Sequence, residues 1–209
     1  GSVLAGSWHH LCMMTSSRIS GAPRDAVDVP PVVAELAAGR ALRPVWRNEL
    51  GGLTFEVIPD SGRDDRCFVK WVPPGTPVDL IDEASRLEWA RRFTPVPEPL
   101  DAGANASGQW LLTRALDGES AVSPRWMNSP WMAVRAIGLG LRALHDALPT
   151  QKCPYTWSVT QRLERARAFG RTPDQFHEDH RWLAFEDAWE LLDNPPPIDY
   201  DARRAAVWS

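Results

Sequence analysis

The chain has 209 residues, of which 44% are hydrophobic and 24% are charged, and its formal net charge at pH 7 is −4. These values are close to those of globular proteins, so they exclude wholesale disorder, and the charge argues against a broadly basic nucleic-acid binder. No apolar run approaches the roughly 18 residues that a transmembrane helix needs, so we expect no membrane partner.

The three cysteines, Cys12, Cys67 and Cys153, are widely spaced and odd in number. Because neither a disulfide framework nor the ligand spacing of a structural zinc is present, the expected location is the reducing cytoplasm. The first two residues resemble the remnant of a cleaved tag, and residues 3–14 lack the basic start and the cleavage site of a signal peptide. We therefore expect residues 1–30 to be a tag remnant and an extended lead-in.

Residues 31–115 alternate between short apolar runs and turn residues, which is typical of an antiparallel sheet. Pro44 lies inside the first run and favours an edge strand, because proline cannot donate a hydrogen bond to a neighbour. Leu80, Ala84 and Leu87 recur at helical spacing and indicate an amphipathic helix. The predicted elements are a helix over 32–38, strands over 42–47, 53–58 and 66–72, a helix over 80–92, and strands over 97–102 and 109–114.

Residues 116–209 have the pattern of a helical lobe. Ser129-Pro130 has an N-cap residue followed by proline at the first helical position, and Ser158 and Gln161 have the spacing of a capping box. The predicted helices cover residues 130–147, 158–169, a stretch after Thr172-Pro173, and 184–193. The expected fold class is therefore α+β, with a sheet-rich lobe over 31–115 and a helical lobe over 116–209.

The sharpest local feature is a lysine inside an apolar strand. Period-two alternation along the strand puts Phe68 and Lys70 on one face, and a lysine there must find an anion or reach an edge. Glu83 lies on the following predicted helix, and Gly51-Gly52 closes the turn between the first two strands. Kinases hold the phosphates of ATP with such a strand lysine and helix glutamate. Taken singly, Lys70 and Glu83 could be surface residues, and Gly51-Gly52 could be an ordinary hairpin turn. The order of the three features along the chain favours a kinase-like lobe.

Further motifs resemble the aminoglycoside 3′-phosphotransferases, which are antibiotic-modifying relatives of the protein kinases, over about residues 40–195. The motifs are Asp82-Glu83-Ala84-Ser85-Arg86-Leu87-Glu88-Trp89, Val96-Pro97, Trp110-Leu111-Leu112-Thr113, Leu144-His145, Cys153-Pro154-Tyr155 and Arg162-Leu163-Glu164-Arg165-Ala166-Arg167. The resemblance implies a protein-kinase-like fold and transfer of the γ-phosphoryl group of ATP to an aminoglycoside hydroxyl, with ATP and magnesium as cofactors.

The resemblance also implies roles for single residues. Lys70 would bind the phosphates and Glu83 would be its ion-pair partner. Phe68 would stack on adenine, and the backbone carbonyl and amide groups of Thr113 and Ala115 would bind the edge of the base. A nucleotide is therefore the first expected partner.

Two further segments have roles by resemblance. The stretch from Gly52 to Thr54 would be the phosphate loop. Residues 171–201 contain nine acidic and two basic residues, about −7 in charge, so the rest of the chain is about +3. Such a segment attracts cations, and Glu178 and Asp179 within it would contact the ammonium groups of an aminoglycoside. The alternative for these two residues is an exposed helix face.

The catalytic part of the family pattern is missing where it is expected. The family carries its catalytic aspartate in a His-Gly-Asp motif and its main magnesium ligand in an Asp-x-Gly-Arg motif. Here the sequence after Pro197 continues as Ile-Asp-Tyr-Asp-Ala-Arg-Arg-Ala-Ala-Val-Trp-Ser. We therefore expect no catalytic residue and no metal ligand in this chain. The expectation is a truncated or inactive form whose helical lobe exposes apolar surface.

Two alternatives stay open beside this interpretation. One is a non-catalytic remnant that binds a nucleotide, a cationic small molecule or a partner protein. The other is a homodimer in which a second copy buries the exposed helical surface. A Lys70→Met change distinguishes them, because it should abolish nucleotide binding but leave a purely structural dimer unchanged.

Overall fold

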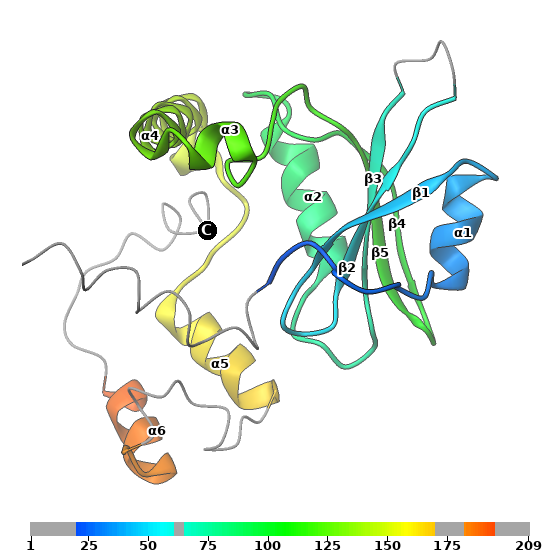
Figure 1. Cartoon of the computed structure of the whole chain (residues 1–209). Coiled ribbons are helices and arrows are strands. Elements are labelled where there is room, and N and C mark those ends of the chain that lie inside the picture. Colours follow the sequence, from blue (N-terminus) through cyan, green and yellow to red (C-terminus); the bar gives the residue numbers. More distant parts are fainter. Residues whose placement is uncertain (1–19, 61–64, 170–181, 195–209) are drawn as a thin grey trace, which may run out of the picture. The chain divides into compact units, whose positions relative to one another are not determined.

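The structure is a computed structural model that describes residues 20–60, 65–169 and 182–194. The chain divides into two compact units, Gly1–Asp117 and Gly118–Ser209, each of which has its own fold. The first unit is a sheet with a helix on each face, and the second unit is helical (Figure 1). The predicted α+β fold class is confirmed.

Five strands of the first unit form one antiparallel sheet in the order β1-β2-β3-β5-β4. The strands are β1 (Leu42–Arg47), β2 (Leu53–Val57), β3 (Cys67–Val72), β4 (Pro99–Asn105) and β5 (Gly108–Arg114). β1 lies at an edge, as Pro44 predicts, and its pairing with β2 shifts between Pro44 and Trp46, which indicates a bulge. β3 lies at the centre of the sheet, so its residues are flanked by strands on both sides.

Two helices cover the two faces of this sheet. The helices are α1 (Pro31–Ala37) and α2 (Leu80–Ala90). On the α1 face, Phe55 and Val69 are fully buried in the larger apolar cluster. On the α2 face, Val72 and Leu111 form a smaller cluster with the first residue of α2. Because side chains alternate along β3, Val72 shares its face with the two residues that lie two and four positions earlier. This α2 face is the one that carries Lys70.

The second unit contains helices only in the residues that the structure describes. They are α3 (Pro124–Met127), α4 (Pro130–Ala147), the 3-10 turn Thr150–Lys152, α5 (Val159–Phe169) and α6 (Phe185–Asp193). The helix α3, which is a single turn, is not predicted from the sequence. No helix among the described residues is long and apolar enough to cross a membrane.

The capping predictions for the second unit are correct in position and only partly correct in chemistry. Ser129 precedes α4 as predicted, but its side chain makes no capping hydrogen bond. The amide of Gln161 donates to the hydroxyl of Ser158 at 3.1 Å. The reciprocal bond of a capping box is not formed, because the side-chain oxygen of Gln161 is buried without a partner in the described structure. The helix predicted after Thr172-Pro173 lies outside the described residues.

Candidate functional site

Lys70 and Glu83 meet on the α2 face of the sheet. The Nζ atom of Lys70, on β3, lies 2.5 Å from Oε1 of Glu83, on α2. Their side chains are 43% and 33% exposed, so the pair is open to solvent on one side. An ammonium group carries three hydrogen-bond donors. Glu83 therefore leaves Lys70 with the capacity to bind a second anion.

The first turn of α2 is fixed by two polar contacts that place Glu83. The carboxylate of Asp79 caps the helix, because it accepts hydrogen bonds from two backbone amides at 3.1 and 2.9 Å. The amide before these two, that of Leu80, donates to the side-chain oxygen of Gln109 on β5 at 2.9 Å. Leu80 itself is 1% exposed. Glu83 follows Leu80 at helical spacing, so it lies on the same, sheet-facing side of α2.

Phe68 lies on the same face as Lys70 and has polar neighbours on both adjacent strands. In the pairing register it stands between Glu56 of β2 and Thr113 of β5. Both neighbours are 6% exposed. The row Glu56, Phe68 and Thr113 therefore places an aromatic ring between two buried polar side chains.

Two residues near Phe68 are absent from the sequence prediction. The guanidinium of Arg66 lies over the Phe68 ring, 6.0 Å from its centroid, and donates to the carbonyl oxygen of Leu116 at 3.0 Å. Glu56 is the other. A signal for Glu56 was available, since a charged residue inside the apolar run of β2 is the same kind of signal as Lys70 in β3.

The two residues predicted to bind the edge of the base lie at the end of β5 and directly after it. Thr113 lies in the ladder between β3 and β4. The amide of Ala115 donates to the carbonyl oxygen of Arg66 at 2.9 Å. That amide is therefore engaged within the protein, and it would have to exchange this bond in order to bind a ligand.

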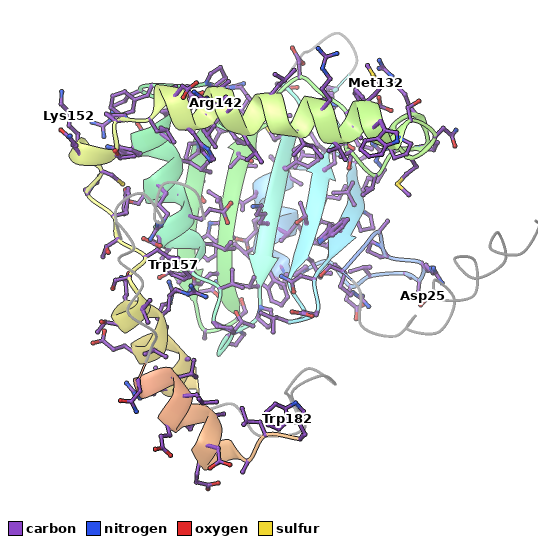
Figure 2. All side chains as sticks on the ribbon, turned by 90° about the vertical axis from the view of Figure 1, so that its left-hand side faces the viewer. Asp25, Met132, Arg142, Lys152, Trp157 and Trp182 are labelled. Atoms are coloured by element: carbon purple, nitrogen blue, oxygen red, sulfur yellow. The ribbon has the colours of Figure 1, made fainter. Side chains whose placement is uncertain are left out.

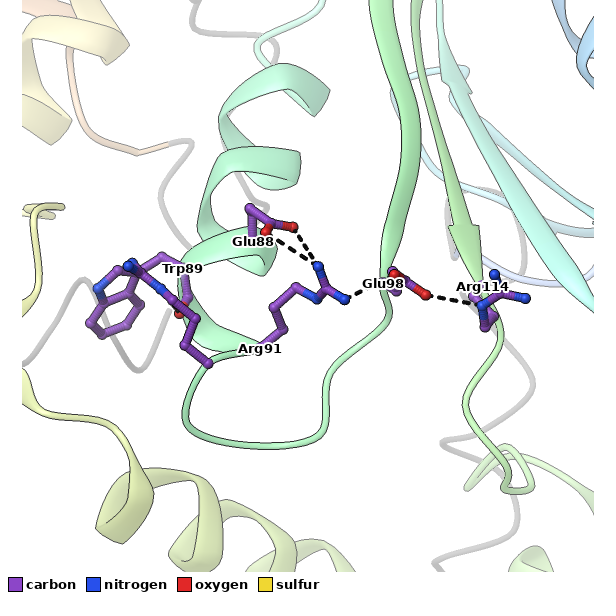
Figure 3. Close-up of polar contacts among 6 residues, drawn as sticks. Glu88, Trp89, Arg91, Glu98 and Arg114 are labelled. Atoms are coloured by element: carbon purple, nitrogen blue, oxygen red, sulfur yellow. Dashed lines mark hydrogen bonds and ion pairs between the residues drawn. The ribbon is translucent and has the colours of Figure 1, made fainter.

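Arg114, between these two residues, belongs to a network that joins α2, β4 and β5 (Figure 3). It donates to Glu98 at 3.0 Å, and Arg91, which follows α2, donates to Glu98 at 2.8 Å and to Glu88 at 3.2 Å. The hydrogen bond from Arg114, together with the charge of Arg91, lowers the pKa of Glu98. The same contact raises the pKa of Arg114. The network holds the end of β5 beside the start of β4.

The turn that leads into the predicted phosphate loop is closed by the side chain of Asn48. Oδ1 of Asn48 accepts the amide hydrogens of Leu50 at 3.0 Å and of Gly52 at 2.7 Å. A Cβ atom on Gly52 would lie 2.5 Å from the side-chain nitrogen of Asn48, so a larger residue would displace the group that closes the loop. The Gly52 amide is thus engaged. Thr54, one residue into β2, is opposite Lys70 in the register.

The opposite face of the sheet has a cavity of about 420 Å³. Its walls include Arg47, Leu53 and Trp71. Because side chains alternate along a strand, these residues lie on the face opposite to that of Lys70. The residues with predicted nucleotide roles do not line this cavity. The candidate site and the cavity are therefore separate features of the first unit.

A family sequence model described as "Phosphotransferase enzyme family" matches residues 46–208, which is more than half of the chain.

The chain belongs to the phosphotransferase enzyme family.

Curated relatives of this phosphotransferase-family chain are aminoglycoside 3′-phosphotransferases. The protein from Streptomyces fradiae is 37% identical over 100 residues, which cover 47% of this chain and 35% of the relative. The protein from Salmonella typhimurium is 27% identical over 157 residues, which cover 72% of this chain and 58% of the relative. The chain thus spans between a third and three fifths of the length of these relatives.

Two solved structures of this phosphotransferase family are similar to the chain. Aminoglycoside-3′-phosphotransferase of type VIII has a TM-score of 0.57 at 28% identity, over 77% of this chain and 60% of that chain. The aminoglycoside phosphotransferase APH(3″)-Id from Streptomyces rimosus has a TM-score of 0.50 at 26% identity, over 79% and 61%. Aminoglycoside phosphotransferases have a protein-kinase-like fold, so the predicted kinase-like fold is confirmed.

The remaining predicted features of a phosphotransferase site are not brought together. Glu178 and Asp179 lie outside the described residues. Among the residues that are described, no cluster of three or more His, Cys, Asp or Glu side chains could hold a metal ion. The letters Asp-x-Gly-Arg do occur at residues 60–63, contrary to the expectation that the chain lacks them. They precede β3 rather than follow the helices, and residues 61–63 are outside the described part.

Proposed function

We propose that this chain binds ATP on the α2 face of its sheet, so that residues 31–115 act as a nucleotide-binding lobe. The contact between Lys70 and Glu83 carries the proposal. Lys70 would bind the phosphates with the donors that Glu83 leaves free, and Glu83 would keep the ammonium group in place. Thr54 faces Lys70 across the strands and would offer its hydroxyl to the same phosphates.

The base would lie one row further along the sheet, on Phe68. An exposed aromatic face stacks on a purine without regard to sequence. The carbonyl of Thr113 and the amide of Ala115 would bind the edge of the base. Binding through Ala115 would require its amide to leave the carbonyl of Arg66, which also lies beside Phe68. Nucleotide binding would therefore be coupled to a small rearrangement of this segment.

We propose phosphoryl transfer to an aminoglycoside hydroxyl as the reaction class to which this site belongs, on the basis of the relatives. Glu186, Asp187 and Glu190 of α6 are exposed and belong to the segment that would attract a cationic substrate. The sequence holds no His-Gly-Asp.

An interaction function is the second candidate, and α4 favours it. This helix has no buried residue, and large apolar side chains along it, including Trp131 and Leu139, are 85% and 62% exposed. Exposed apolar patches mark protein–protein contacts. A second copy of the chain or another protein would cover them.

Thermal unfolding in the presence of ATP, with and without magnesium, tests the nucleotide proposal. A ligand at 100 times its dissociation constant stabilises a protein by about 2.7 kcal/mol, so the melting temperature should rise with ATP. Lys70→Met should abolish the rise, because it removes the phosphate-binding ammonium group. Lys152→Met is the matched control, since it changes the other lysine of the sequence.

Three results would contradict or extend this proposal. No rise at high ATP concentration, or an equal rise in wild type and both variants, would show that ATP does not use Lys70. If Lys152→Met also abolishes the rise in melting temperature, the rise depends on the overall charge of the chain and not on Lys70. Kanamycin in the same assay should stabilise the chain only if the acidic segment forms a substrate site.

A further inference from the structure

Glu56 is a buried carboxylate in the middle of the candidate nucleotide face. Among the described residues, the buried polar or charged residues are Glu56 and Thr113, each 6% exposed as a whole residue. They flank Phe68 in one row that crosses β2, β3 and β5. Burial of a charged group costs free energy unless partners compensate it. A carboxylate at this position therefore needs an explanation.

Arg43 accounts for half of the hydrogen-bonding capacity of Glu56. Its Nε donates to Oε2 of Glu56 at 2.9 Å, and its second terminal nitrogen donates to the same oxygen. The Arg43 side chain is 65% exposed and that of Glu56 is 8% exposed. Both Arg43 contacts are to Oε2, and Oε1 is not one of the buried polar atoms that lack a partner in the described structure, so it is open to solvent. An ionised carboxylate accepts at both oxygens, so Oε1 can accept hydrogen bonds from a ligand.

The position of Glu56 relative to Phe68 and Lys70 suggests what the donor would be. Neighbouring strands are about 4.8 Å apart, and residues two apart on one strand are separated by about 6.8 Å. In the proposed function, on which this inference rests, the base stacks on Phe68 with its edge toward Thr113, and the phosphates reach Lys70. The sugar that joins them then lies on the β2 side of Phe68, beside Glu56.

Ribose offers chemistry that suits Oε1. Its 2′- and 3′-hydroxyl groups are hydrogen-bond donors, and an acidic side chain binds a ribose hydroxyl in dinucleotide-binding folds as well. Hydrogen bonds to a charged acceptor are stronger than those between neutral groups. Arg43 would hold the carboxylate in place without occupying Oε1.

We propose that Glu56 is a ribose-binding residue, which accepts hydrogen bonds from the sugar hydroxyls of the bound nucleotide through Oε1 while Arg43 holds Oε2. The chain then prefers a ribonucleotide over the same nucleotide without sugar hydroxyls. The preference is independent of the base, because Glu56 contacts only the sugar.

Calorimetric titration with ATP and with 2′,3′-dideoxy-ATP tests this proposal. A hydrogen bond to a charged group contributes about 1.5–3 kcal/mol, so wild type should bind ATP at least about tenfold more tightly than the dideoxy compound. Glu56→Met keeps a similar volume but has no acceptor oxygen. It should weaken ATP binding to the level of the dideoxy compound and leave binding of the dideoxy compound unchanged. Glu56→Gln, with one amide oxygen, should restore part of the preference.

Controls separate this inference from the proposed function. Glu35→Gln changes an exposed carboxylate of α1 and should keep the full preference. If wild type binds both nucleotides equally and Lys70→Met still abolishes binding, Glu56 is only a structural partner of Arg43, and ATP binding stands without it. If neither nucleotide binds to wild type, both proposals are wrong. The comparison of the two nucleotides on wild type needs no variant, so a misfolded Glu56→Met would not remove the test.

Discussion

At the scale of single residues, Glu98 connects three elements of the first unit through two arginines. Arg114 donates to one of its oxygens and Arg91 to the other. The pKa of Glu98 is therefore lower in the folded chain than its ordinary value of 4.5. Below pH 4.5, the Glu98 carboxylate therefore binds fewer protons in the folded chain than in the unfolded chain. The contacts therefore stabilise the fold fully above pH 4.5, and their contribution is lost as the pH falls toward the lower, folded value.

Glu98→Gln is predicted to show this pH dependence. At neutral pH the variant should melt at a lower temperature than wild type, because it lacks the charge that both arginines contact. The difference in melting temperature should shrink as the pH is lowered below 4.5, because wild type then loses the same charge by protonation. Glu35→Gln, which changes an exposed carboxylate, should show no such trend. A difference that grows in acid would contradict the prediction.

At the scale of elements, α2 is the helix whose placement decides the geometry of the candidate site. Its N-terminus is fixed by the cap from Asp79 and by the contact of Leu80 with Gln109. Four unsatisfied amides at a helix N-terminus need such partners. Loss of the cap would loosen the turn that carries Glu83.

Asp79→Ala should lower the free energy of unfolding by about 0.5–2 kcal/mol, which is the usual cost of removing an N-cap side chain. Asp79→Asn keeps an acceptor oxygen and should lower the free energy of unfolding much less, because asparagine caps a helix about as well as aspartate does. Urea unfolding of the three chains measures the difference. Equal losses in both variants would show that the charge of Asp79, and not its hydrogen bonds, stabilises α2.

The sequence predicts elements whose signal is local. Alternation and turn residues predict β1 with the bounds that the structure shows, and Pro44 predicts its position at the edge. The single turn of α3 escapes prediction, because four residues are too few to show a helical period. The capping box of α5 is half formed, because a sequence pattern shows which side chains could bond and not how each side chain is oriented.

The candidate site shows the same limit. The face that Lys70 shares with Phe68 follows from strand alternation alone. The engagement of the Gly52 amide by Asn48 and of the Ala115 amide by Arg66 does not, because backbone partners depend on how the loops close. Glu56 joins the site only through the register between β2 and β3, which the sequence does not specify.

At the scale of the whole molecule, α4 is a helix with the composition of a buried one. Its polar side chains are Arg135, Arg142, His145 and Asp146, and its other positions are apolar, glycine or proline. Arg135, Arg142 and Asp146 recur at helical spacing and share one side, so the rest of the helix surface is apolar, and a broad apolar face is expected to be buried. In the second unit none of its residues is buried, and labelled side chains such as Met132 extend from it (Figure 2). The described residues of α4 therefore expose apolar surface, as expected, and a partner that covers this surface stays a prediction.

The self-association predicted from this surface can be measured by sedimentation velocity at increasing protein concentration. Val134, Ile137 and Leu141 are 61%, 49% and 47% exposed and recur at helical spacing, so they form one stripe. Ile137→Asp would bury a charge in any contact made by this stripe. It should weaken association by at least about tenfold, because a central interface residue contributes about 2 kcal/mol or more.

Arg135→Gln, on the same helix, is the matched control and should leave association unchanged, since it removes a charge from a position outside the stripe. If wild type stays monomeric at every concentration, the dimer candidate is wrong, and the α4 surface must be covered by a different protein or by none. If wild type associates and Ile137→Asp associates equally well, the contact uses another surface. Only association that Ile137→Asp weakens and Arg135→Gln preserves would place the interface on α4.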